Sequence, residues 1–248
     1  MSRTDARGVP VREAIPLKGI KRLTAEQMVK SHQVPTVTSF GEADVTELVR
    51  LRKGLAADPA RTGGVAVTYT HLAVKAIAQA LGAHPGLNAA LEGEEILIYD
   101  EINVGVAVAL PDGNLVVPVL HGADRLSLAE IACRLHDLQE RAARGKLTLP
   151  DVQRGTFTLT SFGAIPVLRW ATPLLNPPQA AILGLGAIAE RPVVRDGRIE
   201  IRALAPLSLT YDHRVVNGHP AGLFLQAVAD LLAEPAGLKL GIEGWPTS

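Results

Sequence analysis

The sequence predicts an α/β fold, in which a sheet and a layer of helices form a two-layer α+β sandwich. Of the 248 residues, 47% are hydrophobic, which is enough to bury one sizeable core. Stretches rich in β-branched residues alternate along the chain with stretches of helical periodicity. Neither an internal repeat nor a long Gly/Ser linker divides the chain. We therefore expect a single domain.

Five segments have the periodicity of amphipathic helices, at residues 23–31, 44–55, 70–82, 127–145 and 220–233. Two of them begin with the pattern of a capping box, in which two side chains bond back to the first helical turn. These pairs are Asp44 with Glu47 and Ser127 with Glu130. The start of the chain is charged and contains Pro10, so we expect an extended arm there.

Seven stretches between the helices favour β-structure because of their β-branched and aromatic residues. They cover residues 35–40, 96–99, 103–109, 115–120, 155–162, 180–186 and 199–211. The last stretch runs directly into the last helix, through a connection that contains His213. The predicted organisation is an N-terminal arm (1–14), one catalytic domain (15–240) and a C-terminal tail (241–248).

The composition argues against several classes of partner. Lysine plus arginine number 25, and so do aspartate plus glutamate, so no net charge attracts nucleic acid or a membrane surface. No apolar run approaches the ~20 residues that span a bilayer, and a cytoplasmic location is expected. The single cysteine, Cys133, rules out a disulfide within the chain. The histidines have no metal-ligand spacing, so we expect no metal.

The connection after the last strand contains the best candidate for a catalytic group. Asp212, His213 and Arg214 place three ionisable groups at the end of an apolar strand, where their burial would be costly without a use. A histidine, with an ordinary pKa of ~6.5, can remove a thiol proton near neutral pH. Asn217 can hold the turn through hydrogen bonds but is not a base. Spacing alone leaves catalysis and a satisfied strand-end histidine as equal interpretations.

Three segments carry a resemblance to a known family. His213 with Asn217-Gly218 matches a His-x-x-x-Asp/Asn-Gly motif. Residues 155–163 are similar to a Gly-x-Phe-Thr-Ile-Ser/Thr-Asn-x-Gly segment, in which Thr160 takes the hydroxyl position. Asn176-Pro177-Pro178-Gln179 matches an Asn-Pro-Pro-Gln segment. From residue 15 to about residue 240, the sequence thus resembles the catalytic domain of 2-oxoacid dehydrogenase acyltransferases, which are related to chloramphenicol acetyltransferases.

The resemblance implies a chloramphenicol-acetyltransferase-like fold, in which helices pack on one face of a mixed sheet. It implies transfer of an acyl group between coenzyme A and the dihydrolipoyl thiol of a lipoylated partner. His213 would be the general base, Thr160 would donate its hydroxyl to the oxyanion, and Asn217 would hold the turn. The resemblance also implies that three further residues bind coenzyme A: Ser161, Asn176 and Pro178.

The same resemblance implies a homotrimer whose active sites lie between subunits, so that His213 and Thr160 come from different chains. The implied partners are a lipoylated domain and the 2-oxoacid dehydrogenase components. Larger cages stay open, because the tail 241–248 differs from the apolar end that links trimers in the family. The lipoyl and subunit-binding domains usual in the family are not in this sequence, which fits a fragment or a free-standing homologue.

Two alternative functions remain at this point. One is a structural core protein whose chemistry has lapsed, against which the intact His213 and Thr160 argue. The other is a coenzyme A-dependent acetyltransferase acting on a small hydroxyl acceptor, which the histidine alone would allow. Two departures from the family pattern bear on coenzyme A contacts: Thr36 stands where the family has a histidine, and Ser161 where asparagine is common.

Overall fold

A seven-stranded mixed sheet lies at the centre of the computed structural model, which describes residues 3–242. Strand β8 is parallel to both β4 and β9, whereas β11 is antiparallel to β1, β9 and β10, and β7 is antiparallel to β4. The strand order is β1 (Thr36–Asp44), β11 (Arg198–Asp212), β9 (Ala181–Leu185), β8 (Phe157–Ser161), β4 (Val104–Val106) and β7 (Val119–Leu120), with β10 (Ala189–Arg195) also paired to β11.

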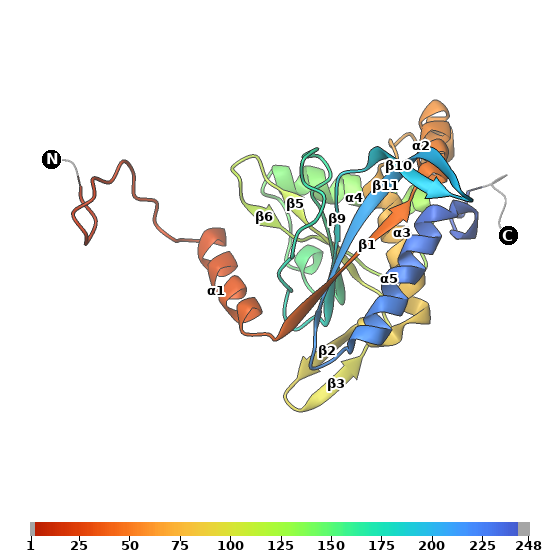
Figure 1. Ribbon diagram of the computed structural model, residues 1–248. Helices are drawn as coiled ribbons and strands as arrows, with labels where there is room; N and C mark the ends of the chain where they lie inside the picture. The colour runs from red at the N-terminus through yellow and green to blue at the C-terminus, as the bar shows by residue number, and fades with distance from the viewer. Residues whose placement is uncertain (1–2, 243–248) are drawn as a thin grey trace.

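Helices cover one face of this sheet (Figure 1). Side chains alternate between the two faces of a strand, and on β11 Leu207, Leu209 and Tyr211 point to the helical side, where each is at most 2% exposed. On β8, the ring of Phe157 packs against that of Phe224, with centroids 5.5 Å apart. The covering helices are α2 (Thr46–Ala57), α3 (Tyr69–Ala83), α4 (Leu128–Ala143) and α5 (Gly218–Ala233).

The opposite face of the sheet carries no helix and is more polar, and we call it the helix-free face. Ser208 and Thr210 on β11 point to this side, and the Thr210 hydroxyl lies 2.8 Å from that of Thr38 on β1. The segment 163–176 runs across it, where the Trp170 indole donates to the Gly41 carbonyl and the Ala171 N–H donates to the Ser208 hydroxyl.

Three smaller parts lie outside this sandwich. Helix α1 (Ile20–His32) lies at the edge of the body, at the end of the N-terminal arm (Figure 1), and its Gln27 side chain donates to the Pro177 carbonyl at 2.9 Å. Two hairpins form their own sheets, β2 (Ala89–Glu92) with β3 (Glu95–Ile98) and β5 (Val108–Ala109) with β6 (Leu115–Val116). Single turns of 3-10 helix lie at 59–62, 85–87, 150–152 and 235–237.

The five predicted helices and the capping box of α4 are present, with the Ser127 hydroxyl accepting from the Glu130 N–H. The predicted capping box of α2 is wrong. Its N-cap residue is Val45, and no side chain caps it. The Asp44 carboxylate, at the end of β1, instead accepts from Thr46 and from the guanidinium of Arg202. A further capping box, which the sequence patterns did not predict, joins Thr68 and His71 at the start of α3.

Two strands were not expected, and two expected strands are divided. β2 is alanine-rich and β10 contains Pro192, both of which weaken a strand pattern. The stretch 103–109 divides into β4 and β5, and 115–120 divides into β6 and β7. Pro118 lies at the second break, where its ring nitrogen has no hydrogen to donate to a ladder.

Between residues 3 and 242, no helix is both long enough and apolar enough to cross a membrane. The N-terminal arm contributes only an isolated bridge between Thr4 and Pro10 ahead of α1. Of the predicted tail, 243–248 lies outside the described residues. The predicted domain boundaries therefore stay a prediction.

Candidate active site

His213 is the first residue after β11, in the turn that leads into α5. Its backbone N–H donates to the Pro35 carbonyl at 2.9 Å. Its ring packs against the buried ring of Tyr211, with centroids 5.8 Å apart. The side chain is exposed, and among the described residues its ring nitrogens have no hydrogen-bond partner. The imidazole is therefore free to bond to a substrate.

Asn217 is the N-cap residue of α5, but its side chain makes no capping bond. Its carbonyl accepts from the Ala221 N–H at 3.2 Å, and its amide is exposed. The expectation that the Asn217 amide holds the turn thus differs from the structure. Asp212 accepts the hydrogen bonds of the turn instead. Its carboxylate accepts from the Arg214 N–H at 2.9 Å, and its carbonyl accepts from the Val216 N–H.

Thr160 lies near the end of β8, half-buried, on the helix-free face. It is opposite Gly184 on β9, and its hydroxyl has no hydrogen bond within the described part of the chain. Thr158, two residues earlier on the same face, donates to the Gln179 amide oxygen at 2.6 Å. Gln179 in turn donates to the Gly155 carbonyl at 2.9 Å. The Asn-Pro-Pro-Gln segment therefore fastens the start of β9 to β8.

His213 and Thr160 lie at opposite ends of the sheet. The register aligns Thr160 with Gly184, and Gly184 with Ser208 on β11. From Ser208 the chain runs on to His213, a span of about 17 Å at ~3.3 Å per residue. Two strand spacings add about 10 Å sideways. The two side chains cannot meet within one chain.

The three residues expected to contact coenzyme A line three separate pockets. Ser161 lies with Thr70 of α3 on a pocket of about 590 Å³. Asn176 lies under α1 on a groove of about 350 Å³, where its side-chain oxygen accepts from Gln27 at 3.1 Å. Pro178 lines a third pocket of about 520 Å³. Within one chain, these residues do not form a common site.

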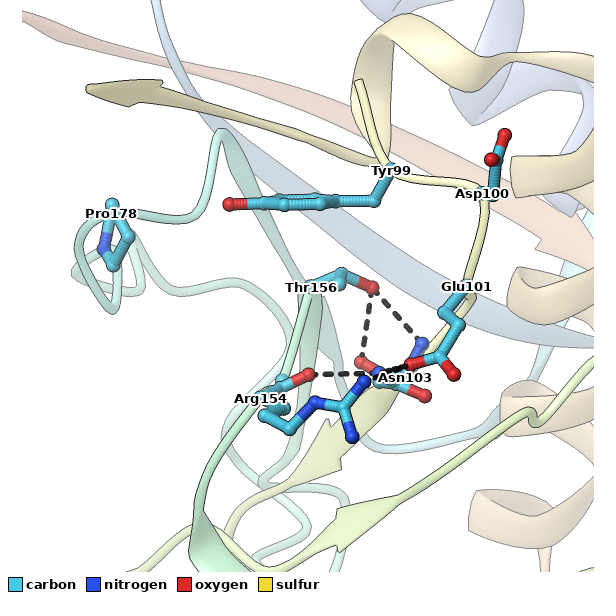
Figure 2. Close-up of a pocket in the computed structure, with 8 residues that line it drawn as sticks. Tyr99, Asp100, Glu101, Asn103, Arg154, Thr156 and Pro178 are labelled. Carbon is cyan, nitrogen blue, oxygen red and sulfur yellow. Dashed lines mark hydrogen bonds and ion pairs between the residues drawn. The ribbon is translucent and has the colours of Figure 1, made fainter. Parts of the chain in front are cut away.

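Figure 2 shows the pocket beside Pro178. The sequence patterns did not predict this pocket. The Tyr99 ring lies along one side, and Arg154 donates to the Glu101 carboxylate at 2.8 Å. Asn103 donates to the same carboxylate at 3.1 Å and to the Arg154 carbonyl at 3.0 Å. The hydrogen bond from Asn103 and the charge of Arg154 lower the pKa of Glu101.

This pocket lies at the His213 end of the sheet. Pro178 lies three residues before Ala181, the first residue of β9, and the Ala180 carbonyl accepts from the Asp212 N–H at 2.8 Å. In the folded chain, Arg154 beside the pocket has a positive φ of 61°, which is uncommon for a non-glycine residue. A φ value cannot be read from a sequence, so the sequence carried no signal for this pocket.

The described residues contain no group of three or more His, Cys, Asp or Glu side chains that could hold a metal ion. The most perturbed histidine is His71, near the start of α3. It is 4% exposed, and burial, followed by the charge of His136, lowers its pKa to about 4. Its Nδ1 accepts from the Thr68 N–H at 3.2 Å in the capping box of α3. His71 therefore caps a helix and faces no substrate.

Comparisons with known proteins identify the family of the chain. Residues 10–240 match the family model described as 2-oxoacid dehydrogenases acyltransferase (catalytic domain). The dihydrolipoyllysine-residue acetyltransferase component of the pyruvate dehydrogenase complex of Mycoplasma capricolum is 38% identical, over 90% of this chain and 51% of its own length. The succinyltransferase component of the 2-oxoglutarate dehydrogenase complex of Haemophilus influenzae is 35% identical, over 92% and 56%. The chain spans about half the length of these relatives.

Solved structures give the same result. The dihydrolipoamide acetyltransferase of Azotobacter vinelandii superposes with a TM-score of 0.86 at 35% identity, over 96% of this chain and 98% of the other. The cubic core of a pyruvate dehydrogenase multienzyme complex gives the same values. A chloramphenicol acetyltransferase, with a TM-score of 0.55 and 14% identity over 90% of this chain and 100% of that one, shares the fold.

The predicted fold class is thereby confirmed, including the likeness to chloramphenicol acetyltransferase. The family match covers the end of β11 with His213, the end of β8 with Thr160, and the segment around Gln179 that ties β8 to β9. The chain belongs to the family of 2-oxoacid dehydrogenase acyltransferase catalytic domains.

Proposed function

We propose that the chain transfers an acyl group between coenzyme A and the dihydrolipoyl thiol of a lipoylated partner domain. The observation that carries the proposal is the exposed imidazole of His213 at the end of β11, whose ring nitrogens have no hydrogen-bond partner between residues 3 and 242. The names of the relatives support it, since they are dihydrolipoyllysine-residue acetyl- and succinyltransferases. The structure from Azotobacter vinelandii belongs to an investigation of the role of a serine, a histidine and an asparagine in the catalytic mechanism of that enzyme. That asparagine follows its histidine by four positions, as Asn217 follows His213.

In the proposed reaction, the neutral His213 ring accepts the proton of the attacking thiol. The thiolate then forms a bond to the thioester carbonyl carbon, and the carbonyl oxygen becomes an oxyanion. The Thr160 hydroxyl donates a hydrogen bond to this oxyanion, where one such donor is worth about 3 to 4 kcal/mol in other enzymes. Collapse expels the second thiolate, which takes the proton back from the imidazolium. The reaction needs no acyl-enzyme and no metal.

Two adjacent hydroxyls are candidates for the oxyanion donor. In the Azotobacter vinelandii enzyme, the serine precedes its histidine by 52 positions. Here Ser161 precedes His213 by 52 positions and Thr160 by 53. Successive residues on a strand point to opposite faces, so Thr160 lies on the helix-free face and Ser161 beside α3. We assign the role to Thr160, since the helix-free face is the one left open to a second chain.

The proposed site is complete only in an oligomer, and we propose a homotrimer. The separation of His213 from Thr160 supports this, because a second copy must supply the missing half. Exposed apolar side chains also support it, since a surface of this kind marks a protein contact. Those on β1 and on the segment crossing the helix-free face include Phe40, Val167, Trp170 and Leu174, which are 54%, 81%, 40% and 46% exposed.

Further assembly belongs to the same proposal. One similar structure is the cubic core of a pyruvate dehydrogenase multienzyme complex, which supports partners among the 2-oxoacid dehydrogenase components. A cage built from these trimers is a second expectation, which electron microscopy of the purified protein would check. Ser161, Asn176 and Pro178 remain proposed coenzyme A contacts, to be joined across subunits. The cytoplasmic location stays a prediction, which cell fractionation would check.

Acyl transfer assays test the proposed function directly. Acetyl-, succinyl- and isobutyryl-coenzyme A are each offered with dihydrolipoamide or with chloramphenicol. We expect turnover with dihydrolipoamide and one preferred acyl group. The His213→Ala variant should lose a factor of about 10² to 10⁴ in kcat, the range for a general base, while the assembly persists. His136→Ala, which removes an exposed histidine from α4, is the matched control and should retain wild-type turnover.

Three results would contradict the proposal. Turnover with chloramphenicol alone would favour a hydroxyl acceptor, and the absence of any transfer would favour a lapsed structural core. Near-wild-type activity of His213→Ala would remove His213 as the base.

A further inference from the structure

The turn that carries His213 is fully hydrogen-bonded along its backbone, and one residue accepts most of these bonds. The Asp212 carboxylate accepts from the N–H of Arg214 at 2.9 Å. The Asp212 carbonyl accepts from two further N–H groups of the same turn, at 3.0 and 2.9 Å. The N–H groups of the turn and their acceptors are Asp212 to Ala180, His213 to Pro35, and Arg214, Val215 and Val216 to Asp212.

The Asp212 carboxylate is also held by the side chain of Arg214. The side chain of Asp212 is 6% exposed, whereas that of Arg214 is 48% exposed. The Arg214 Nε donates to both carboxylate oxygens at 3.0 and 3.2 Å, and Nη2 donates to Oδ2 at 2.7 Å. The planar fork of a guanidinium matches a carboxylate in this geometry, and lysine cannot reproduce it. The pair therefore fixes the residues on both sides of His213.

We propose that Asp212 and Arg214 form a clamp that sets the position of the His213 ring, and that both are positioning residues for acyl transfer. The clamp rests on the function proposed above. Because no side chain hydrogen-bonds to the imidazole within the described residues, its position depends on its backbone and on its packing against Tyr211. A misplacement of about 1 Å can cost about 100-fold in rate. A rigid turn therefore orients the His213 ring, a role that a hydrogen-bonded side chain has in other sites.

The surroundings of His213 make the clamp testable through pH. The loop 33–35 on one side carries no titratable side chain. Besides the pair itself, the titratable groups nearest along the chain are Tyr211 on β11, His219 in the first turn of α5, and His32 at the end of α1, which directly precedes that loop. The Asp212–Arg214 pair supplies both adjacent charges, which offset each other. Removal of Arg214 leaves the negative charge of Asp212 beside the imidazole, whereas removal of Asp212 leaves the positive charge of Arg214 there.

The test compares Arg214→Lys, Arg214→Gln and Asp212→Asn. We expect kcat to fall about 10-fold in Arg214→Lys and about 100-fold in the other two, with KM for both substrates within about 2-fold of wild type. In Arg214→Gln, the lone carboxylate favours the imidazolium, so the acid limb of kcat/KM shifts to higher pH. In Asp212→Asn, the lone guanidinium shifts it to lower pH. The double variant should be no slower than the slower single variant.

Arg202 and Asp44 provide a matched control on the other end of β11. They form a similar ion pair, with Nε 2.7 Å from Oδ2 and side chains that are 17% and 28% exposed. Arg202→Lys should lower the thermal stability of the protein with unchanged kcat and an unchanged pH profile. A purely structural role for Asp212 and Arg214 predicts the same behaviour from their variants. That result, or wild-type kcat in Arg214→Lys, would overturn the clamp.

A second readout needs no activity. In protein labelled with ¹³Cε1-histidine, the His213 signal is identified by its loss in His213→Ala, and its midpoint is followed against pH. Midpoints that move in opposite directions in Arg214→Gln and Asp212→Asn support the clamp, and midpoints that stay at the wild-type value overturn it. If the wild-type protein transfers no acyl group, the proposed function fails, and this titration still decides the clamp. Arg214→Lys keeps the positive charge, so it is the control for this titration and should leave the midpoint close to the wild-type value.

Discussion

The two ends of the central sheet hold different chemistry. At one end, His213 follows β11 with an exposed imidazole and no side-chain hydrogen bond among the described residues. At the other end, the hydroxyl of Thr160 on β8 has no hydrogen bond among the described residues, and on the helical side of the sheet His71 is buried in the capping box of α3. The pKa of His71 is lowered to about 4, chiefly by burial. One end thus offers a base, and the other offers only a hydrogen-bond donor.

This difference explains how a site can be split between chains. A histidine that is neutral because it is buried cannot reach a substrate, so His71 cannot replace His213 at the Thr160 end. The base and the donor are kept apart by the strand register, which no side-chain rotation changes. The proposed trimer would bring the unlike ends of two copies together, since a cyclic interface joins two different surfaces of the same chain. Three predictions test this comparison.

The largest effect is expected at the Thr160 end. Thr160→Ala should lower kcat by a factor of about 10² to 10³, the usual loss for one oxyanion donor, with little change in KM. Thr160→Ser keeps a hydroxyl and should stay near wild type. Ser161→Ala is the neighbouring control and should stay within a few-fold of wild type. If Ser161→Ala is the slow variant and Thr160→Ala is not, the donor role passes to Ser161.

The second prediction tests whether the two ends combine between chains. His213→Ala and Thr160→Ala, each nearly inactive alone, are co-expressed with different tags, and the mixed trimers are purified through both tags. Selection through both tags removes the two homotrimers, so each mixed trimer has one interface in about three that pairs an intact His213 with an intact Thr160. Activity should therefore return to about a third of wild type. If the mixed trimers are as inactive as the two single variants, the site does not lie between chains.

The third prediction concerns stability at the His71 end. The folded-state pKa of His71 is lowered to about 4, so the unfolded chain binds the proton first as pH falls. Stability is then lost between about pH 6.5 and pH 4, by about 3 kcal/mol in total. In His71→Gln, which keeps an acceptor for the capping box, the free energy of unfolding should depend less on pH. Urea titrations at pH 7 and pH 4.5, at one protein concentration, measure this. An equal pH dependence in both proteins would contradict it.

The sequence predicted the helices well, and it predicted the extent of the paired strands less well. The helix caps at Ser127 and the helical periodicities were correct because they depend on neighbouring residues. The pattern over 103–109 gave one strand, whereas the ladder of β4 ends at Val106. Strand β10 was missed because Pro192 weakens its pattern, although its backbone pairs with β11 over seven residues. Partners distant in sequence decide both outcomes.

The sequence by itself determined which groups are available for catalysis. Residue type and spacing left His213 evenly balanced between a base and a satisfied strand-end histidine, and the resemblance to the family motifs singled out His213 and Thr160. Only the tertiary structure decided how they are arranged. The register of β11, β9 and β8 sets them at opposite ends of the sheet. The folded chain also shows that the buried Asp212 carboxylate accepts hydrogen bonds within the turn, whereas the Asn217 side chain makes no capping bond. These outcomes depend on pairings between distant segments, which local sequence patterns do not encode.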